Sequence, residues 1–161
     1  VLHLDAGMAA TRVLILDQVT DPRNIGAIMR SALALGASAI MMTDRHAPEE
    51  TGALAKTAAG ALEKLSIIRV TNLARALGSL KEAGFTLVGL EASGTTALDL
   101  FAAEPRLGLV LGSEGSGMRR LTREGCDHMA AIPISPDSES LNVSVAAAIA
   151  LYATSFKEQS Q

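Results

Sequence analysis

The sequence predicts an α/β domain in which a mostly parallel six-stranded sheet carries helices on both faces. Short runs of Val, Ile, Leu and Met alternate along the chain with amphipathic segments of helical length, the pattern of a parallel sheet connected by helices. The runs are continuously apolar, as expected for strands buried on both faces. Hydrophobic residues make up 48% of the 161 residues and aromatic residues only 2%. Aliphatic side chains must therefore fill the core, which suits closely packed α/β layers.

The elements follow in order along the chain. The strands are expected at residues 12–16, 39–42, 66–70, 86–90, 107–111 and 128–132. Helices are expected at residues 25–35, 51–65, 72–83, 119–125 and 140–157, with one or two helical turns around 98–102. Asn24, Asn72 and Ser140 are suited to begin helices, because their side chains can accept a first-turn N–H. No linker or internal repeat divides the chain, so one domain is expected over residues 1–161.

Composition excludes several classes of function. The net charge of −3 and the scarcity of aromatic residues argue against a free-standing nucleic-acid binder or a stacking platform for single strands. An RNA-related role would then need local arginines or a missing partner domain. Cys126 is the only cysteine, so an intrachain disulfide and a cysteine-based zinc site are excluded, and a reducing compartment such as the cytoplasm fits. The three histidines are scattered, and no metal is expected.

Neither a membrane span nor a signal peptide is indicated. No apolar run reaches the ~20 residues that cross a bilayer, and the chain begins without the pattern of a secretory leader. We therefore expect no membrane partner.

Three polar loops follow predicted strands, at the edge of the sheet where α/β proteins bind ligands. The first, residues 21–26, leads into a helix that bears Arg30. Gly26 lies one turn into this helix, where glycine costs ~1 kcal/mol relative to alanine, so the position favours close approach of a ligand or of backbone. Arg30 is either a ligand contact or a surface arginine paired with a neighbour.

The second loop is residues 112–118, GSEGSGM. Its glycine spacing is neither the dinucleotide fingerprint nor a phosphate-binding P-loop. Glu114 would be unfavourable beside a phosphate, so a cationic or neutral ligand or a buried Glu–Arg pair is favoured over a plain turn. The third loop, residues 133–139, precedes Ser140, Leu141 and Asn142, and indicates either a polar-ligand site or a capped helix. After the second loop, Arg119, Arg120 and Arg123 are interpreted as a solvated helix face or as RNA phosphate contacts.

Taken together and in this order, the three loops resemble the SpoU/TrmH family of RNA ribose 2′-O-methyltransferases, within the SPOUT superfamily. The segments that carry the resemblance are DPRNIGAIMRSALALGA (21–37), LVLGSEGSGM (109–118) and IPISPDSESLNVSVAAAIALY (132–152). The similarity covers nearly the whole chain from Val13 onward. Segments 69–77 and 117–127 look closest to the RlmB-type enzymes, which methylate a guanosine of 23S ribosomal RNA.

The resemblance implies a fold and partners that composition does not reveal. It implies a C-terminal deep trefoil knot, a homodimer, and bound S-adenosyl-L-methionine. By motif match, the cofactor contacts are Gly112, Ile132, Leu141 and, less directly, Leu90. Simple core packing is the alternative interpretation for Ile132 and Leu141. The RlmB-type proteins carry a small RNA-binding domain before the catalytic one, and we expect that domain to be absent from this chain.

Catalytic roles are likewise implied by the resemblance. Arg30 matches the catalytic arginine of the family. Because a guanidinium keeps its proton, we expect it to hold RNA phosphate and stabilise negative charge on the ribose hydroxyl rather than to act as a base. Asn24, Ser140 and Asn142 would position the ribose and Arg30, and Glu114 would orient Arg30 or its own loop.

The expected function is methyl transfer from S-adenosylmethionine to a ribose 2′-hydroxyl of RNA, with a guanosine of 23S rRNA as the target. A tRNA ribose methyltransferase is the alternative within this class. From a different class, the chain could be a non-catalytic RNA- or nucleotide-binding module with the same fold. The glycine spacing of residues 112–118 argues against a nicotinamide-linked oxidoreductase.

Overall fold

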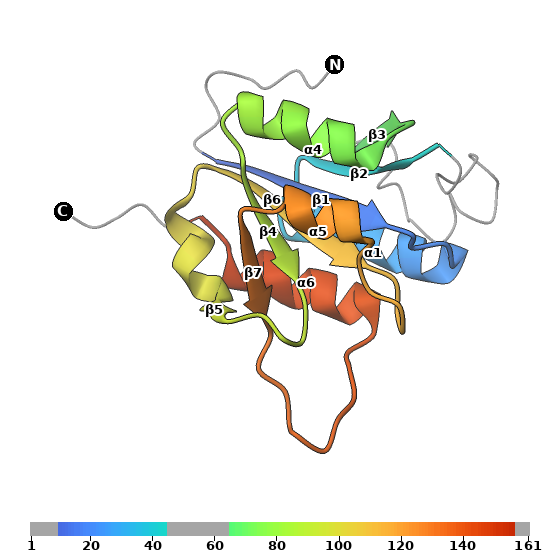
Figure 1. Cartoon of the computed structure of the whole chain (residues 1–161), viewed down its shortest axis with the longest axis vertical. Helices are drawn as coiled ribbons and strands as arrows, with labels where there is room; N and C mark the ends of the chain where they lie inside the picture. The colour runs from blue at the N-terminus through green and yellow to red at the C-terminus, as the bar shows by residue number, and fades with distance from the viewer. Residues whose placement is uncertain (1–9, 45–64, 157–161) are drawn as a thin grey trace.

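A computed structural model of the chain describes residues 10–44 and 65–156, which form a parallel seven-stranded sheet with helices on both faces (Figure 1). The strand order is β3-β2-β1-β6-β4-β7-β5, and every pair of neighbours is parallel. The strands are β1 (Thr11–Asp17), β2 (Ala39–Thr43), β3 (Ser66–Val70), β4 (Thr86–Leu90), β5 (Thr96–Ala97), β6 (Arg106–Gly112) and β7 (His128–Ala131). The helices are α1 (Pro22–Ala34), α4 (Leu73–Glu82), the 3-10 helix η1 (Leu98–Ala103), α5 (Arg120–Gly125) and α6 (Val143–Ala153).

The α/β class and the parallel sheet are confirmed, but the predicted number of six strands was wrong. The seventh strand, β5, has two residues and pairs with β7 at the edge of the sheet through Thr96 and Ala97. So short a strand leaves no apolar run to recognise, because its backbone pairing rather than its side chains defines it. The helical turns expected around 98–102 are η1. The helix expected at 51–65 lies outside the described residues.

Two of the predicted helix starts were wrong. Helix α1 is capped by Asp21, whose carboxylate accepts the Arg23 N–H at 2.9 Å, and not by Asn24. Pro22 then occupies the first turn, where its missing N–H costs nothing. Helix α6 is capped by Asn142, whose Oδ1 accepts the Ser144 N–H at 2.8 Å, and not by Ser140. In both cases a competing cap residue stood within three positions, and spacing alone did not separate the two.

Two apolar layers hold the helices to the sheet. Residues of α1, α6 and η1 pack on one face, where the strands present alternate side chains such as Leu14, Leu16 and Leu109. On the other face, α4 packs against the intervening residues such as Val13 and Ile15. In Figure 1, α4 lies above the sheet and α6 below it. The alternation along β1 thus places its side chains in both layers, as expected for a doubly covered strand.

A buried arginine joins the two ends of the described chain. Arg12, at the start of β1, is 5% exposed and donates hydrogen bonds to the backbone oxygens of Thr154 (2.9 Å), Glu104 (2.6 Å), Ala102 (3.3 Å) and Thr11 (3.2 Å). The Thr154 and Glu104 carbonyls belong to the C-terminal caps of α6 and η1, where helix carbonyls lack intrahelical partners and attract a cation. Burial lowers the pKa of Arg12, and the nearby Glu104 carboxylate partly offsets that effect. Arg12 is therefore a structural cation.

Sheet order brings three strand ends together. Strands β6, β4 and β7 are neighbours and parallel, so their carboxyl ends, Gly112, Leu90 and Ala131, share one edge of the sheet. Helix α6 begins beside this edge and packs on α1. Ligands of open α/β sheets bind at such edges.

Candidate active site

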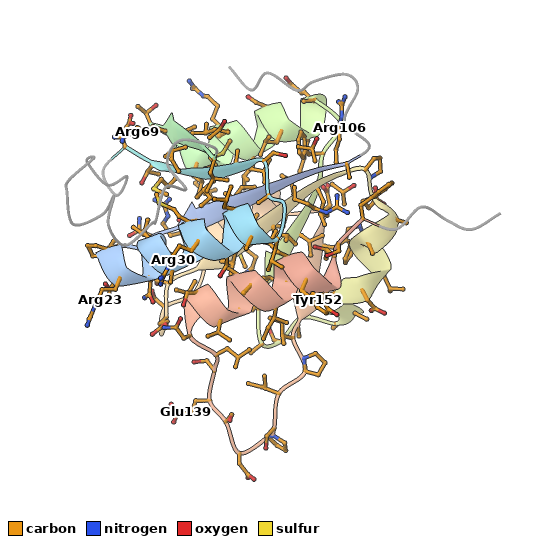
Figure 2. The ribbon with its side chains drawn as sticks, turned by 180° about the vertical axis from the view of Figure 1, so that it is seen from behind. Arg23, Arg30, Arg69, Arg106, Glu139 and Tyr152 are labelled. Carbon is orange, nitrogen blue, oxygen red and sulfur yellow. The ribbon has the colours of Figure 1, made fainter. Side chains whose placement is uncertain are left out.

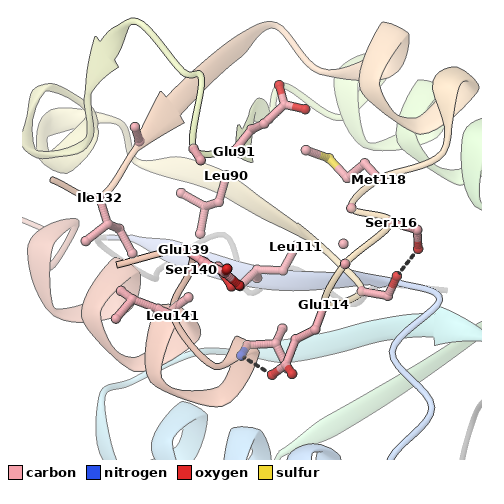
Figure 3. A pocket seen from close by; sticks show the side chains of 18 of the residues that line it. Leu90, Glu91, Leu111, Glu114, Ser116, Met118, Ile132, Glu139, Ser140 and Leu141 are labelled. Carbon is pink, nitrogen blue, oxygen red and sulfur yellow. Dashed lines mark hydrogen bonds between the residues drawn. The ribbon is translucent and has the colours of Figure 1, made fainter. Parts of the chain in front are cut away.

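A cavity of about 710 Å³ lies at this edge, between the ends of β4, β6 and β7 and the start of α6 (Figure 3). Its volume falls within the range that holds drug-sized ligands. The lining includes all four residues expected to contact a cofactor: Leu90, Gly112, Ile132 and Leu141. The lining also includes Glu114 and Ser140. Residues from three loops far apart in the sequence thus line one chamber.

The floor of the cavity is apolar and its rim is polar. Leu90, Ile132 and Leu141 are half-buried, and Leu90 and Ile132 also pack against the core layer that contains α1 and α6. Core packing and ligand contact are therefore compatible for Ile132. Such a surface suits a flat apolar ring, while the rim offers backbone and carboxylate groups to polar substituents.

The loop after β6 is folded tightly on itself. A Cβ at Gly112 would lie 2.2 Å from the carbonyl carbon of Gly117, so no side chain fits there. The Gly117 N–H donates to the Ser113 carbonyl at 2.9 Å, and the Ser113 and Ser116 hydroxyls are 2.6 Å apart. Gly115 and Gly117 have φ values of 87° and 68°, which favour glycine. The loop is thus a built wall of the cavity and not a plain flexible turn.

A buried carboxylate anchors the far end of this loop. Asp17, the last residue of β1, is fully buried, and its Oδ2 accepts the Arg119 backbone N–H at 2.8 Å. Its Oδ1 accepts the Arg119 guanidinium, at 2.8 Å from Nε and 2.7 Å from Nη2. Because one carboxylate oxygen binds the backbone of Arg119 and the other binds its guanidinium, Asp17 fixes both the position and the direction of the chain that leaves the loop.

Glu114 contacts the start of α6. Its Oε1 accepts the Val143 N–H at 3.1 Å, one of the first N–H groups of the helix. A carboxylate is stabilised there by the helix dipole as well. No hydrogen bond or ion pair joins Glu114 to Arg30 within the described ranges. Glu114 therefore connects the glycine loop to α6, and it is exposed rather than part of a buried Glu–Arg pair.

The remaining predicted catalytic residues are not among the residues that line the cavity. The Asn142 Nδ2 donates to the Asn24 Oδ1 at 3.2 Å, which links the first turns of α6 and α1. Arg30 is exposed on α1 (Figure 2), and among residues 10–44 and 65–156 it has no hydrogen-bond or ion-pair partner. The predicted site residues thus separate into Leu90, Gly112, Glu114, Ile132, Ser140 and Leu141 around the cavity, and Asn24 and Asn142 at the first turns of α1 and α6. Arg30 lies six residues beyond Asn24 on α1 and, in the described part of the chain, forms no hydrogen bond or ion pair with either group.

Sequence reasoning missed three charged residues of the lining. Glu91 and Arg123 form an ion pair between the end of β4 and α5, and Glu139 lies on the loop that leads to Ser140. Glu91 follows a predicted strand directly, so the argument that singled out the other loops could have found it. Arg123 and Glu139 become lining residues only once the fold brings α5 and the loop over the strand ends.

The three arginines around α5 each have an acidic partner. Arg119 pairs with Asp17, Arg123 with Glu91, and Arg120 with Glu124 at 3.1 Å in an i,i+4 pair. Their charges are thus largely compensated within the domain, which favours a structural role over direct RNA contact.

Cys126 behaves as a core residue. Burial raises the pKa of its thiol to about 11, so the reactive thiolate is scarce at neutral pH. In the described part of the chain no cluster of His, Cys, Asp and Glu could hold a metal ion. Nor does any helix there combine the length and the apolar character needed to cross a bilayer.

Comparison with known proteins identifies the family. The model of the SpoU rRNA Methylase family matches residues 11–152. The chain belongs to this family. The chain is 48% identical over 140 residues to a 23S rRNA (guanosine-2′-O-)-methyltransferase RlmB of a Burkholderia species, covering 87% of this chain and 57% of that protein. It is 47% identical over 140 residues to a tRNA/rRNA methyltransferase of Synechocystis, described as uncharacterized, covering 87% and 36%.

Solved structures agree with this membership. The SpoU methyltransferase AviRb from Streptomyces viridochromogenes, solved in complex with AdoMet, superposes with a TM-score of 0.81 at 27% identity. The match covers 92% of this chain and 60% of that one. The present chain therefore spans about half the length of the curated relatives it matches.

Proposed function

We propose that this chain transfers a methyl group from S-adenosyl-L-methionine to a ribose 2′-hydroxyl of RNA, with a guanosine of 23S rRNA as the target. The observation that carries the proposal is the cavity at the ends of β4, β6 and β7, which gathers the four residues expected to contact the cofactor. Family membership over residues 11–152 and the similarity to RlmB proteins support it.

The cavity fits the cofactor in size and chemistry. Its volume of about 710 Å³ accommodates a nucleoside joined to an amino acid. Leu90, Ile132 and Leu141 offer an apolar surface for adenine. The backbone of the loop from Gly112, where a side chain would clash, lets polar groups of the ligand approach closely. When bound, S-adenosylmethionine supplies an electrophilic methyl group on a sulfonium.

The residues beside the cavity suit the RNA substrate. Arg30 is exposed and uncompensated within the described chain, so its guanidinium is available to hold a phosphate and to stabilise negative charge on the 2′-oxygen. The hydrogen bond between Asn24 and Asn142 fixes the two helix starts that flank this position. Ser140 lines the cavity and offers a hydroxyl to the ribose. Glu114 acts through the α6 N-terminus as a positioning residue.

We further infer that the protein acts as a homodimer. The outer face of α6 carries Val145, Ile149 and Tyr152, which are 45%, 38% and 74% exposed. Their i, i+4, i+7 spacing forms one apolar stripe, of the kind that pairs with a second protein surface. Sedimentation at micromolar concentration is expected to give twice the chain mass, and a monomer would contradict this inference.

The chain crossing near β7 supports a knotted C-terminus. After β4, the Glu91 N–H donates to the Ala130 carbonyl at 3.0 Å. A Cβ at Gly94 would lie 2.4 Å from the Ala130 carbonyl carbon. The segment between β4 and η1 thus passes against β7 at backbone contact, and we infer that the chain beyond β7 is threaded through the loop this segment helps to close. The cytoplasm, where ribosomal RNA is made, is the proposed location.

Substitution of Arg30 tests the proposal. For Arg30→Ala we expect the rate of methyl transfer to 23S rRNA fragments to fall by roughly 100- to 1000-fold, because a charge-stabilising donor is lost. Calorimetry should show cofactor affinity near that of the wild type, since Arg30 does not line the cavity. Arg75→Ala, an exposed arginine on α4, is the control and should retain activity. Equal loss of cofactor binding and of methyl transfer in Arg30→Ala would contradict the role assigned to Arg30. If the wild-type chain binds no cofactor at millimolar concentration, the proposed enzymatic function itself is refuted.

A further inference from the structure

The charged side chains that line the cavity are unequal in sign. Among the lining residues that the structure describes, Glu91, Glu114 and Glu139 are acidic and Arg123 alone is basic. Such an excess of negative charge in a cleft favours cationic ligands and disfavours neutral or anionic ones. The excess lies within a cavity of about 710 Å³, so it acts on whatever occupies that space.

Two of the three carboxylates are already compensated. Glu91 forms its ion pair with Arg123 across the cavity wall. Glu114 accepts the Val143 N–H at the positive end of the α6 dipole. Their charges are therefore at least partly offset within the protein.

Glu139 is the uncompensated carboxylate of the lining. Within residues 10–44 and 65–156 it has no hydrogen-bond or ion-pair partner, and it is exposed while lining the cavity. It directly precedes Ser140 and Leu141, which line the same cavity (Figure 3). A carboxylate held there without a partner can interact with a positive charge in the ligand.

The charge of the cofactor changes during the reaction. S-adenosylmethionine carries a sulfonium, an ammonium and a carboxylate, for a net single positive charge. When the methyl group leaves for the 2′-oxygen, the bonding electron pair stays on sulfur, and S-adenosylhomocysteine remains as a neutral zwitterion. The hydroxyl proton goes to solvent. Only the first form of the ligand bears the extra positive charge.

We propose that Glu139 makes the cavity selective for the cationic cofactor over its neutral product. This inference rests on the proposed function and adds to it a residue that sets the preference of the cavity for cofactor over product. At the separations and solvent exposure expected here, one carboxylate shifts the relative affinities by about 5-fold. Because the group is exposed, salt should reduce the preference.

Calorimetry with three ligands tests the proposal. S-adenosylmethionine and sinefungin, in which an amine replaces the sulfonium centre, are cationic, and S-adenosylhomocysteine is neutral. For Glu139→Gln, we expect the Kd of both cationic ligands to rise by about 5-fold while that of S-adenosylhomocysteine is unchanged. In the wild type, raising NaCl from about 0.05 to about 0.5 M should reduce the preference for the cationic ligands over S-adenosylhomocysteine. In Glu139→Gln, the same change in salt should leave the ratio of the Kd values unchanged.

Asp137→Asn is the matched control. Asp137 lies on the same loop and is exposed, but it does not line the cavity, so its substitution should leave all three affinities unchanged. The proposal is overturned if Glu139→Gln weakens all three ligands equally, if it changes none, or if Asp137→Asn has the same effect. Failure of the wild type to bind any of the three would refute the proposed function instead.

Discussion

Two arginines of this domain, Arg12 and Arg30, differ in burial and in hydrogen bonding. At the amino edge, Arg12 is buried and donates to four backbone carbonyls. On α1, the helix that begins after the carboxyl end of β1, Arg30 is exposed and has no partner within the described chain. A buried cation that donates to several backbone carbonyls stabilises the fold, whereas an exposed and unpaired one remains available for a ligand. The difference separates a structural edge of this domain from a functional one.

Substitution of Arg12 should produce the largest loss of stability. Arg12→Ala leaves the carbonyls of Thr154, Glu104 and Ala102 without their donor, and unsatisfied buried groups cost ~1–3 kcal/mol each. We expect roughly 3 kcal/mol of destabilisation by urea unfolding, with the methyl-transfer rate of the folded fraction unchanged. Arg106→Ala, which removes an exposed donor to the Ala83 carbonyl, is the control and should cost less. If the folded fraction of Arg12→Ala transfers methyl groups more slowly than the wild type, Arg12 also affects the active site. The structural and functional roles of the two edges would then not be separate.

Gly112→Ala should act on the functional edge. A Cβ there would lie 2.2 Å from Gly117 backbone, so the loop must move out of the cavity wall. We expect cofactor affinity to fall by about 10-fold or more, with a smaller loss of stability, roughly 1–2 kcal/mol. Gly78→Ala on α4, where a Cβ meets nothing within 4 Å, should instead keep the affinity and slightly stabilise the helix. Normal cofactor affinity in Gly112→Ala would show that this loop does not form part of the binding site.

Gln18→Gly should give the smallest effect, and of the opposite sign. Gln18 follows Asp17 at the carboxyl edge and has φ of 64°, a conformation that is strained for a residue with a side chain. Glycine relieves this strain but adds freedom to the unfolded chain, so we expect a net gain of about 0.5 kcal/mol or less, seen as a slightly higher melting temperature. A clear loss of stability would show that the Gln18 side chain makes a stabilising contact. The cost of its positive φ would then be smaller than the value of that contact.

Residue patterns predicted the parts of the fold that depend on side-chain burial. The six longer strands and the helices on both faces follow from apolar runs and their spacing. The two-residue β5 and the choice between Asp21 and Asn24 as a cap depend on backbone geometry, which side-chain patterns do not reveal. For the site, too, residue patterns predicted one part, and the other part depended on the three-dimensional packing. The placement of loops after strands, together with the family resemblance, pointed to six residues that line the cavity. Arg123 and Glu139 reach the cavity only through the packing of α5 and the final loop.

The hydrogen bond from Arg12 to Thr154 joins residues 142 positions apart. During translation, β1 emerges from the ribosome long before the end of α6 has been made. Until Thr154 is available, the guanidinium of Arg12 cannot complete its set of partners at the start of β1, an inner strand of the sheet. Assembly of the domain is therefore completed only after nearly all of it has left the ribosome.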